Sequence, residues 1–266
     1  MEKNFKFRNG RIHYRDQGRG MTIILVHGHL ETSEIWSSFA GKLAEKFRVI
    51  SIDLPGHGKS DIFGEVHTLE FMATVVRDLI ESLGTERIFL IGHSMGGYVT
   101  MAFVDLYPDM LTGYCLFHSH PLADSTEVVM KRKLDINTVR AGGKNKLIPV
   151  SIPKMFANQN LQTFSDAIQR SMKIALSVPA DGIVAVLKGM MARPSRLYLM
   201  EEGRVPCLWL LGAMDNYIDC EQIQTKVRLP GNAEVHILNG SGHMGFIEEE
   251  ERSLEIVAEF AGKLSV

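Results

Sequence analysis

The sequence predicts an α/β fold: a mostly parallel central sheet covered on both faces by helices, with a helical cap inserted between two strands. Short apolar runs alternate with longer helix-like segments, as in parallel sheets buried on both faces. This alternation stops between residues 121 and 203, where only helical stretches occur. The 266 residues, 45% of them hydrophobic, suffice for one large core carrying an insertion. We therefore expect a core domain of residues 1–120 and 204–266 and a cap of residues 121–203.

The first 83 residues supply strands and helices for one side of the core. Asn9-Gly10 is a hairpin-turn signal between runs that alternate polar and apolar residues. Ser33 and Thr68 can each cap a helix, and Gly84 follows the end of the second one. The predicted elements are a hairpin over residues 5–16, strands at 22–26 and 47–52, and helices over 33–46 and 68–83.

The stretch RIFLIGHSMGGYV, residues 87–99, joins a strand to a helix through a sharp turn at Ser94. The backbone N–H groups and the dipole of the helix expected over 98–107 would favour negative charge there. A Cβ at Gly92 or Gly96 is expected to collide with the neighbouring strand or helix. The G-x-S-x-G pattern in this setting indicates a nucleophile elbow, and a tight turn with a helix-capping serine is the alternative.

The remaining elements surround the helical insertion. The insertion helices are predicted from the spacing of apolar residues and are separated by glycine and proline. They lie near residues 125–141, 161–177, 180–192 and 195–201, with breaks at Gly142-Gly143, Pro149, Pro153, Pro179 and Pro194. Strands at 111–117, 206–212 and 233–238 and helices at 219–228 and 246–264 complete the prediction.

Several polar residues directly follow predicted strands. Ligands of an open parallel sheet bind outside the carboxyl ends of its strands, so these side chains are expected to face one crevice. They are His27, His29, Asp53, Ser94, His118, Ser119, His120, Asp215 and His243.

A serine nucleophile needs a base to take its proton and a third group to orient that base. His243 lies in the glycine-rich loop NGSGHMGF, which can deliver an imidazole to the sheet edge. Asp215 follows the preceding strand of the sheet. A polar loop histidine and a turn or helix-capping aspartate are the alternatives, and Asp219 is a rival acid because it too can cap a helix.

Five sequence landmarks follow one another along the chain. They are His27-Gly28 with Trp36 downstream, DLPGHGKS at 53–60, GHSMGG at 92–97, Val205-Pro206 leading to Gly212 and Asp215, and Gly242-His243. With these landmarks the chain resembles the α/β-hydrolase superfamily, in its capped esterase and enol-lactonase-like branch, over nearly its whole length. The chain order Ser94, Asp215, His243 is the one expected of that fold.

This resemblance implies specific roles. Ser94 would be the nucleophile, His243 the general base and then acid, and Asp215 the carboxylate that orients the imidazole. The backbone N–H groups of Met95 and His29 would form an oxyanion hole. Relatives that act on haloalkanes or epoxides carry aspartate at the elbow, so Ser94 favours acyl-enzyme chemistry.

Other residues are candidates for substrate contact. His118, Ser119 and His120 enter the insertion, although ordinary loop polarity explains them equally well. Met155 and Met190 would give a pliable lining for an apolar substrate, with core packing as the alternative. The paired imidazoles at 27/29 and 118/120 lack a nearby Cys, Asp or Glu to complete a metal site. We expect neither a metal nor a cofactor.

The charge is unevenly distributed. The whole chain has a net charge of −2, whereas the 12 Lys and Arg and 7 Asp and Glu of residues 121–203 leave +5 there and −7 elsewhere. Inward-facing cations would steer anionic substrates to the pocket, and a solvated outer face is the alternative. The near-neutral balance and the lack of a signal-peptide-length apolar run predict a cytoplasmic protein whose partner is a small molecule, not nucleic acid or membrane. Homo-oligomer formation stays open.

The sequence thus predicts a serine hydrolase that cleaves a small or medium carboxylic ester, lactone or thioester through an acyl-enzyme on Ser94. C–C bond hydrolysis, acyl transfer or a cofactor-free lyase step on the same triad is the alternative within enzymes. A binding or sensor protein that keeps the fold without turnover is the alternative outside them.

Overall fold

The computed structural model describes residues 1–264 and contains one sheet of eight strands within them, in the order β1-β2-β4-β3-β5-β6-β7-β8. The β1–β2 and β2–β4 pairs are antiparallel, and every pair from β4 onward is parallel. The strands are β1 (Glu2–Phe7), β2 (Gly10–Gln17), β3 (Thr22–Val26), β4 (Arg48–Ile52), β5 (Ile88–His93), β6 (Leu111–Phe117), β7 (Cys207–Gly212) and β8 (Ala233–Leu238). The predicted fold class is confirmed.

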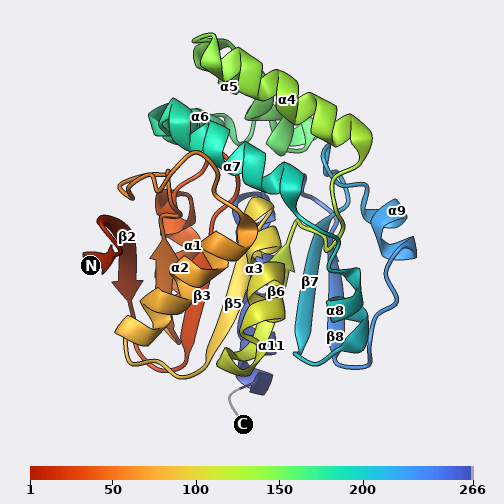
Figure 1. The fold of residues 1–266 in the computed structure, drawn as a ribbon. Coiled ribbons are helices and arrows are strands. Elements are labelled where there is room, and N and C mark those ends of the chain that lie inside the picture. Colours follow the sequence, from red (N-terminus) through yellow and green to blue (C-terminus); the bar gives the residue numbers. More distant parts are fainter. Residues whose placement is uncertain (265–266) are drawn as a thin grey trace.

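Helices cover both faces of the sheet, which is why its central strands are apolar throughout. Every residue of β3, β5 and β7 is buried. In Figure 1, α2 (Leu69–Ser82) and α3 (Met95–Leu106) lie in front of the sheet and α11 (Glu250–Leu264) lies behind it. The shorter helices of the core are α1 (Ser37–Leu43), α9 (Cys220–Thr225) and α10 (Gly245–Glu248).

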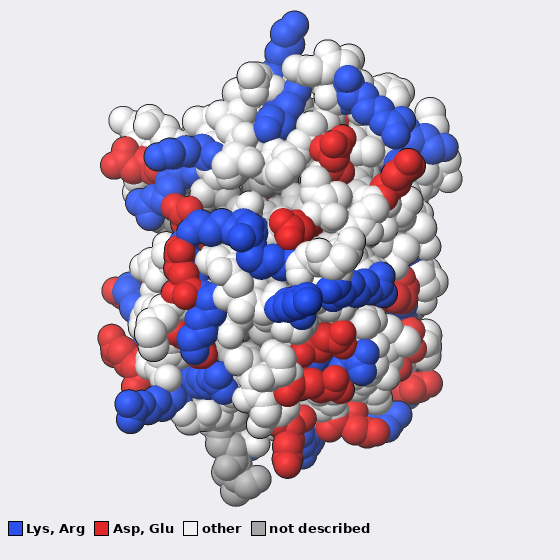
Figure 2. Space-filling view, turned by 60° about the vertical axis from the view of Figure 1, so that its left-hand side comes forward, with Lys and Arg blue, Asp and Glu red and all other residues white. Residues whose placement is uncertain are grey.

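The insertion, residues 121–203, connects β6 to β7. Its helices are α4 (Thr126–Arg140), α5 (Lys144–Ser151), α6 (Ser165–Ser177), α7 (Ala180–Ala192) and α8 (Leu197–Glu202). Figure 1 shows α4 to α7 above the carboxyl ends of the parallel strands, whereas α8 lies beside the sheet. Figure 2 shows Lys and Arg side chains over the upper part of one face and a denser group of acidic side chains on its lower part. The division into two domains stays a prediction.

Two predicted helices differ from the structure, and one helix of the insertion was not predicted. The helix expected at 33–46 is a 3-10 turn (Ser33–Trp36) followed by α1, and its cap is Thr32, whose hydroxyl accepts from the Glu34 N–H. Helix α5 was not predicted because it encloses Pro149, a residue that normally ends helices. The closing helix is interrupted at Glu249 because that side chain bonds back to the Gly240 N–H and the Ser241 hydroxyl.

Within residues 1–264, no single helix is both long and apolar enough to cross a membrane. Helices α6 and α7 are long and apolar enough only when they are taken together, and the chain bends by 95° between them.

Candidate active site

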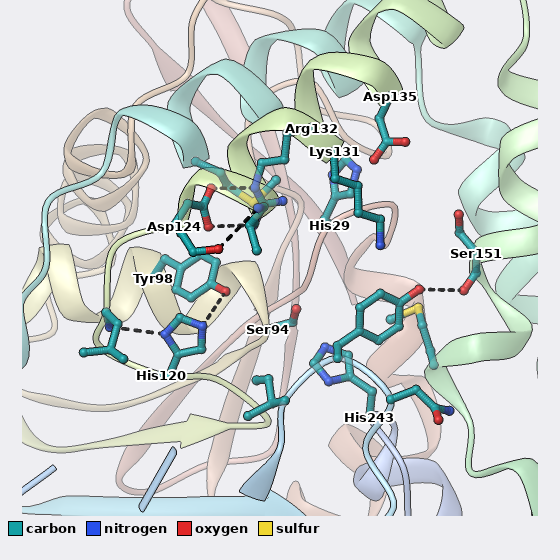
Figure 3. Close-up of a pocket in the computed structure, with 18 of the residues that line it drawn as sticks. His29, Ser94, Tyr98, His120, Asp124, Lys131, Arg132, Asp135, Ser151 and His243 are labelled. Carbon is teal, nitrogen blue, oxygen red and sulfur yellow. Dashed lines mark hydrogen bonds and ion pairs between the residues drawn. The ribbon is translucent and has the colours of Figure 1, made fainter. Parts of the chain in front are cut away.

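Ser94 occupies the turn between β5 and α3, at the floor of a cavity (Figure 3). Its backbone has φ +50° and ψ −113°, a conformation that is strained for any residue other than glycine. A Cβ at Gly92 would lie 2.2 Å from the Gly96 carbonyl oxygen, and a Cβ at Gly96 would lie 2.2 Å from that of Val26. The expected collision at both glycines is confirmed, and it explains how the strained turn fits against β3.

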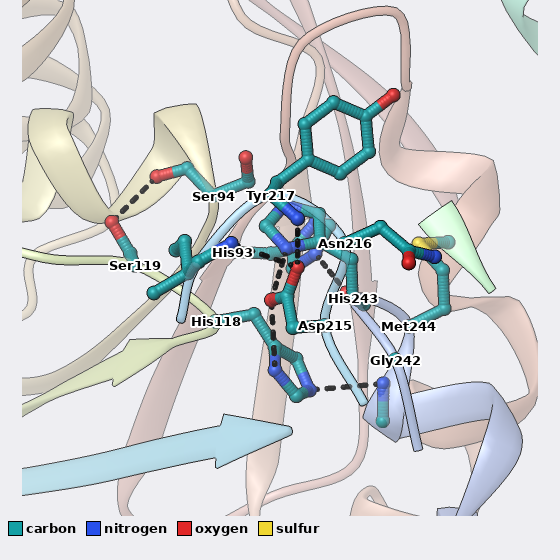
Figure 4. Close-up of polar contacts among 12 residues, drawn as sticks. His93, Ser94, His118, Ser119, Asp215, Asn216, Tyr217, Gly242, His243 and Met244 are labelled. Carbon is teal, nitrogen blue, oxygen red and sulfur yellow. Dashed lines mark hydrogen bonds and ion pairs between the residues drawn. The ribbon is translucent and has the colours of Figure 1, made fainter. Parts of the chain in front are cut away.

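The ends of β6 and β7 hold the main chain of Ser94 in place. The Ser94 N–H donates to the Phe117 carbonyl at 3.0 Å, and the Ser119 hydroxyl donates to the Ser94 carbonyl at 2.8 Å (Figure 4). The indole N–H of Trp209 in turn donates to the Ser119 carbonyl at 2.8 Å. The strained turn is therefore braced by the end of β6 and the residues that follow it, which Trp209 of β7 supports in turn.

His243 and Asp215 form a buried hydrogen-bonded pair. His243 Nδ1 lies 2.6 Å from Asp215 Oδ2, and the other carboxylate oxygen accepts from the N–H groups of Tyr217 and Ile218. With Nδ1 donating to the carboxylate, Nε2 is the nitrogen that can accept a proton. The rival acid Asp219 instead caps α9, accepting from the Gln222 N–H at 2.9 Å.

The two groups shift each other's pKa in opposite directions. Burial opposes the charged form of His243, but the charge of Asp215 and the hydrogen bond to it outweigh burial and raise the His243 pKa above its ordinary value. Burial likewise opposes ionisation of Asp215, yet His243 holds the pKa of this carboxyl below its ordinary value. Asp215 is thus ionised at neutral pH beside an imidazole of increased basicity.

A buried network of hydrogen bonds connects the loop of His29 to the loop of His243. Glu31 accepts from the Gly28 N–H at 2.5 Å and from His93 Nδ1 at 2.9 Å. His93 Nε2 donates to the His243 carbonyl at 2.8 Å. Burial opposes ionisation of Glu31, but His93 and the Gly28 N–H keep its pKa below the ordinary value. The sequence analysis did not single out Glu31 or His93. An acid in the loop directly after an apolar strand, as Glu31 is, was a usable signal.

The cavity has a volume of about 480 Å³ and lies between the sheet edge and the insertion. Ser94, His243 and His29 line it from the core, so the structure brings these predicted residues together. His120, Met155 and Met190, three of the candidate substrate contacts, line it as well. Residues that the sequence did not single out add polar groups to the wall, namely Tyr98, Asp124, Lys131, Arg132, Asp135 and Tyr217.

His118 and Ser119 lie behind the elbow instead of on the cavity wall. Ser119 braces Ser94, as described above, and His118 is fully buried beneath Asp215 (Figure 4). His118 Nε2 accepts from the Gly245 N–H at 3.0 Å, which leaves the hydrogen on Nδ1, 3.8 Å from Asp215 Oδ2. Burial holds the pKa of His118 well below its ordinary value. We therefore no longer expect either residue to touch substrate, because the strand end turns both inward.

Three of the four histidines considered for a metal site, His27, His118 and His120, have other hydrogen-bond partners. His27 Nε2 accepts from the Leu54 N–H at 3.0 Å, and its Nδ1 donates to the Gly28 carbonyl at 2.8 Å. His120 Nδ1 accepts from the Leu122 N–H at 3.2 Å. Across residues 1–264, no three His, Cys, Asp or Glu side chains are grouped so as to hold a metal ion.

Comparison with known families identifies the fold. The model of the Alpha/beta hydrolase family matches residues 23–259, from β3 into α11, and so includes every site residue discussed above. The chain belongs to the alpha/beta hydrolase family.

Solved and curated members of this alpha/beta hydrolase family resemble the chain over nearly its whole length. A thermophilic esterase from Thermogutta terrifontis, solved with malate bound, is 29% identical with a TM-score of 0.93, and the match covers 100% of both chains. The enol-lactonase from Burkholderia xenovorans LB400, 19% identical, shares the fold with a TM-score of 0.87, over 98% of this chain and 100% of its own.

A curated relative adds a third comparison. The 2-hydroxy-6-oxononadienedioate/2-hydroxy-6-oxononatrienedioate hydrolase of Paraburkholderia phymatum is 26% identical, over 95% of this chain and 91% of its own. Together with the family match, these relatives make this alpha/beta hydrolase an enzyme of the hydrolase type that acts on a small molecule.

Proposed function

We propose that the chain is a serine hydrolase that cleaves a small or medium carboxylic ester, lactone or thioester through an acyl-enzyme on Ser94. The observation that carries the proposal is that the strained serine lines the same cavity as His243, the imidazole that is hydrogen-bonded to Asp215. A binding protein has no need of a nucleophile, a base and an orienting acid in one place.

Each group has a defined task in this mechanism. His243 Nε2 takes the Ser94 proton as the hydroxyl attacks the carbonyl carbon, and Asp215 stabilises the imidazolium that forms. The N–H of Met95, the first amide of α3, and that of His29 bind the oxyanion. His243 then protonates the leaving alcohol, activates a water and so frees the acid.

The cavity and the relatives support the substrate class. A volume of about 480 Å³ suits a small or medium substrate. The Thermogutta terrifontis protein is named an esterase and was solved with malate bound, which supports ester chemistry in this chain. The name of the Paraburkholderia phymatum hydrolase favours a second candidate, C–C bond hydrolysis on the same residues.

Covalent labelling tests the nucleophile. A fluorophosphonate probe should label the wild type and not Ser94→Ala, and that substitution should lower kcat for p-nitrophenyl acetate by roughly 10³-fold or more. The matched control Ser165→Ala changes an exposed serine at the start of α6 and should behave like wild type. A folded wild type that takes no label and cleaves no ester contradicts the proposal.

A further inference from the structure

We propose that the wall of the cavity formed by Arg132, His29 and Lys131 is a subsite for a carboxylate of the substrate. This inference rests on the proposed ester cleavage and deepens it, because it names the substrate class. The substrates would be esters, lactones or thioesters that carry a second, free carboxylate.

Arg132 of this wall and Arg193 behind it share a single carboxylate, that of Asp124, so one positive charge is left unbalanced. Asp124 Oδ2 accepts from Arg132 Nε at 2.7 Å and its Oδ1 from Arg132 Nη2 at 3.2 Å, and Arg193 Nη1 also lies 2.6 Å from Oδ1. All three side chains are at most 15% exposed. Among residues 1–264, no other acid lies within ion-pair distance of either guanidinium. Two cations therefore share one carboxylate in a largely buried position, and such an excess charge favours an anionic ligand.

The arginine that faces the cavity has a donor to spare. Arg132 uses Nε and Nη2 for Asp124, while its Nη1 has no hydrogen-bond partner within residues 1–264. Arg193 is fixed behind it, with its guanidinium carbon 3.6 Å from the centroid of the Tyr98 ring. In Figure 3, Arg132 lies beside Asp124 and near His29, above Ser94. A ligand carboxylate bound there would satisfy the remaining amino group of Arg132.

His29 provides an independent sign of a missing ligand. The residue lines the same cavity, and its buried Nδ1 has no partner in the part of the chain that the structure describes. Burial and the nearby charge of Arg132 lower the His29 pKa to about 3, so the ring is neutral at neutral pH. Buried polar atoms in native proteins are almost always hydrogen-bonded. A neutral imidazole can direct an N–H at a ligand oxygen and so explain this exception.

The other charged residues of the wall carry equal numbers of positive and negative charges. Lys131 lies with its ammonium 5.3 Å from the centroid of the Tyr217 ring, and Asp135, one helical turn further along α4, offsets its charge. Burial raises the pKa of Asp135, against the lowering effect of Lys131 and Arg132. Lys226 and Asp219, which also line the cavity, form a second balanced set. One net positive charge remains, and it matches a carboxylate better than a phosphate dianion.

Two pairs of esters test the subsite. The two members of each pair are nearly identical in shape, and only one of them carries a negative charge. Ethyl hydrogen succinate and ethyl succinamate place the carboxylate or amide on the acyl side. O-butyrylglycolate and O-butyrylglycolamide place it on the alcohol side. In the wild type at low salt, we expect kcat/KM for the acid of at least one pair to exceed that for its amide by roughly tenfold or more. Added sodium chloride should reduce the preference.

Three variants assign the preference to the wall. Arg132→Met should reduce the preference for the acid over its amide to about threefold or less. Asp124 keeps Arg193 as its partner in this variant, so no buried carboxylate is left alone. Lys131→Met should reduce the preference by a smaller factor. The matched control Lys133→Met removes an exposed cation of the same helix and should retain the full preference.

Binding to the Ser94→Ala variant separates this proposal from the proposed function. Calorimetric titration with the same esters should show tighter binding of the acid, and adding Arg132→Met should abolish the difference. If the wild type cleaves none of the esters but Ser94→Ala shows this pattern, the subsite stands and ester cleavage fails. Equal rates and equal binding for acid and amide in both pairs overturn the subsite, as does a preference that survives both Arg132→Met and Lys131→Met.

Discussion

The pairing of His243 with Asp215 sets the pH range in which we expect activity. Catalysis needs neutral His243, so kcat/KM should rise with pH through the His243 pKa, which lies above 6.5 because of Asp215. Asp215→Asn should move this rise to lower pH and reduce kcat on the order of 10³–10⁴-fold. A pH profile of ester hydrolysis measures both effects. Asp219→Asn, which weakens only the cap of α9, should leave the profile in place, and an unmoved profile in Asp215→Asn contradicts the assignment.

The carboxylate of Glu31 supports both the fold and the site. Glu31→Gln keeps the shape but loses the charge that receives Gly28 and His93, so we expect the free energy of unfolding to fall by about 1–3 kcal/mol. Gly28 precedes His29, whose N–H is the proposed oxyanion donor. We therefore expect Glu31→Gln to lower kcat by a larger factor than it changes KM. Urea unfolding and steady-state kinetics measure the two effects. Glu34→Gln changes an exposed acid in the 3-10 turn that follows this loop and is the control, and equal stability of both variants would refute the role.

Single residues differ in how well the sequence predicts them. Ser94, Asp215 and His243 each follow a strand, so the topology of a parallel sheet brings them together. His118 and Ser119 follow a strand in the same way, yet side-chain direction at a strand end depends on local backbone that no pattern encodes. Asp124, in the segment just before α4, meets Arg132 of that helix, and no spacing in the sequence predicts that contact.

At the scale of elements, two glycines let α7 approach the core. A Cβ at Gly189 would lie 1.8 Å from the His67 carbonyl oxygen, and one at Gly182 would lie 2.0 Å from that of Gly56. The His67 N–H also donates to the Ala185 carbonyl at 3.0 Å. Helix α7 therefore contacts the core backbone to backbone.

Alanine substitution tests this contact. Gly189→Ala should lower the free energy of unfolding by about 1–3 kcal/mol, because either the helix or the loop of His67 must move. Gly41→Ala in α1, where nothing lies within 4 Å of the added Cβ, should instead raise it by about 0.5–1 kcal/mol. Urea unfolding compares the two. A stabilising Gly189→Ala would mean that α7 is not held this closely.

The elements that the sequence predicted best are those with strong local signals. The parallel strands and α7 lie within two residues of their expected limits, and the hairpin within three, because apolar runs and turn residues define them. Helix ends inside the insertion were less predictable. Helix α6 begins at Ser165, four residues later than expected. A 3-10 turn at Asn158–Asn160 precedes it, and the Asn160 amide donates to the Gly240 carbonyl in the loop of His243.

At the scale of the molecule, the insertion is joined to the core by polar contacts in its middle and near its carboxyl end. The His243 N–H donates to the Met155 carbonyl at 2.7 Å, and Glu248 accepts from the Ala157 N–H and the Asn160 amide at 2.8 Å. Near the carboxyl end of the insertion, Arg196 pairs with acids on α2 and α3. The insertion and the core should therefore unfold together.

Two optical signals test this cooperativity. Both tryptophans, Trp36 and Trp209, lie outside the insertion, whereas the insertion contributes helices to the far-ultraviolet circular dichroism. We expect tryptophan fluorescence and circular dichroism at 222 nm to follow one urea transition with the same midpoint. A loss of helical signal at lower urea than the fluorescence change would show that the insertion unfolds first.

Met155 touches the site in two ways that are chemically independent. Its carbonyl oxygen holds the backbone of His243, whereas its side chain lines the cavity. Every amino acid offers the same carbonyl, so replacement of this side chain reshapes the space around a substrate and leaves the support of the base intact. Mutation at such a position can alter substrate range without rebuilding the chemistry, which is one physical route by which a single catalytic scaffold diversifies.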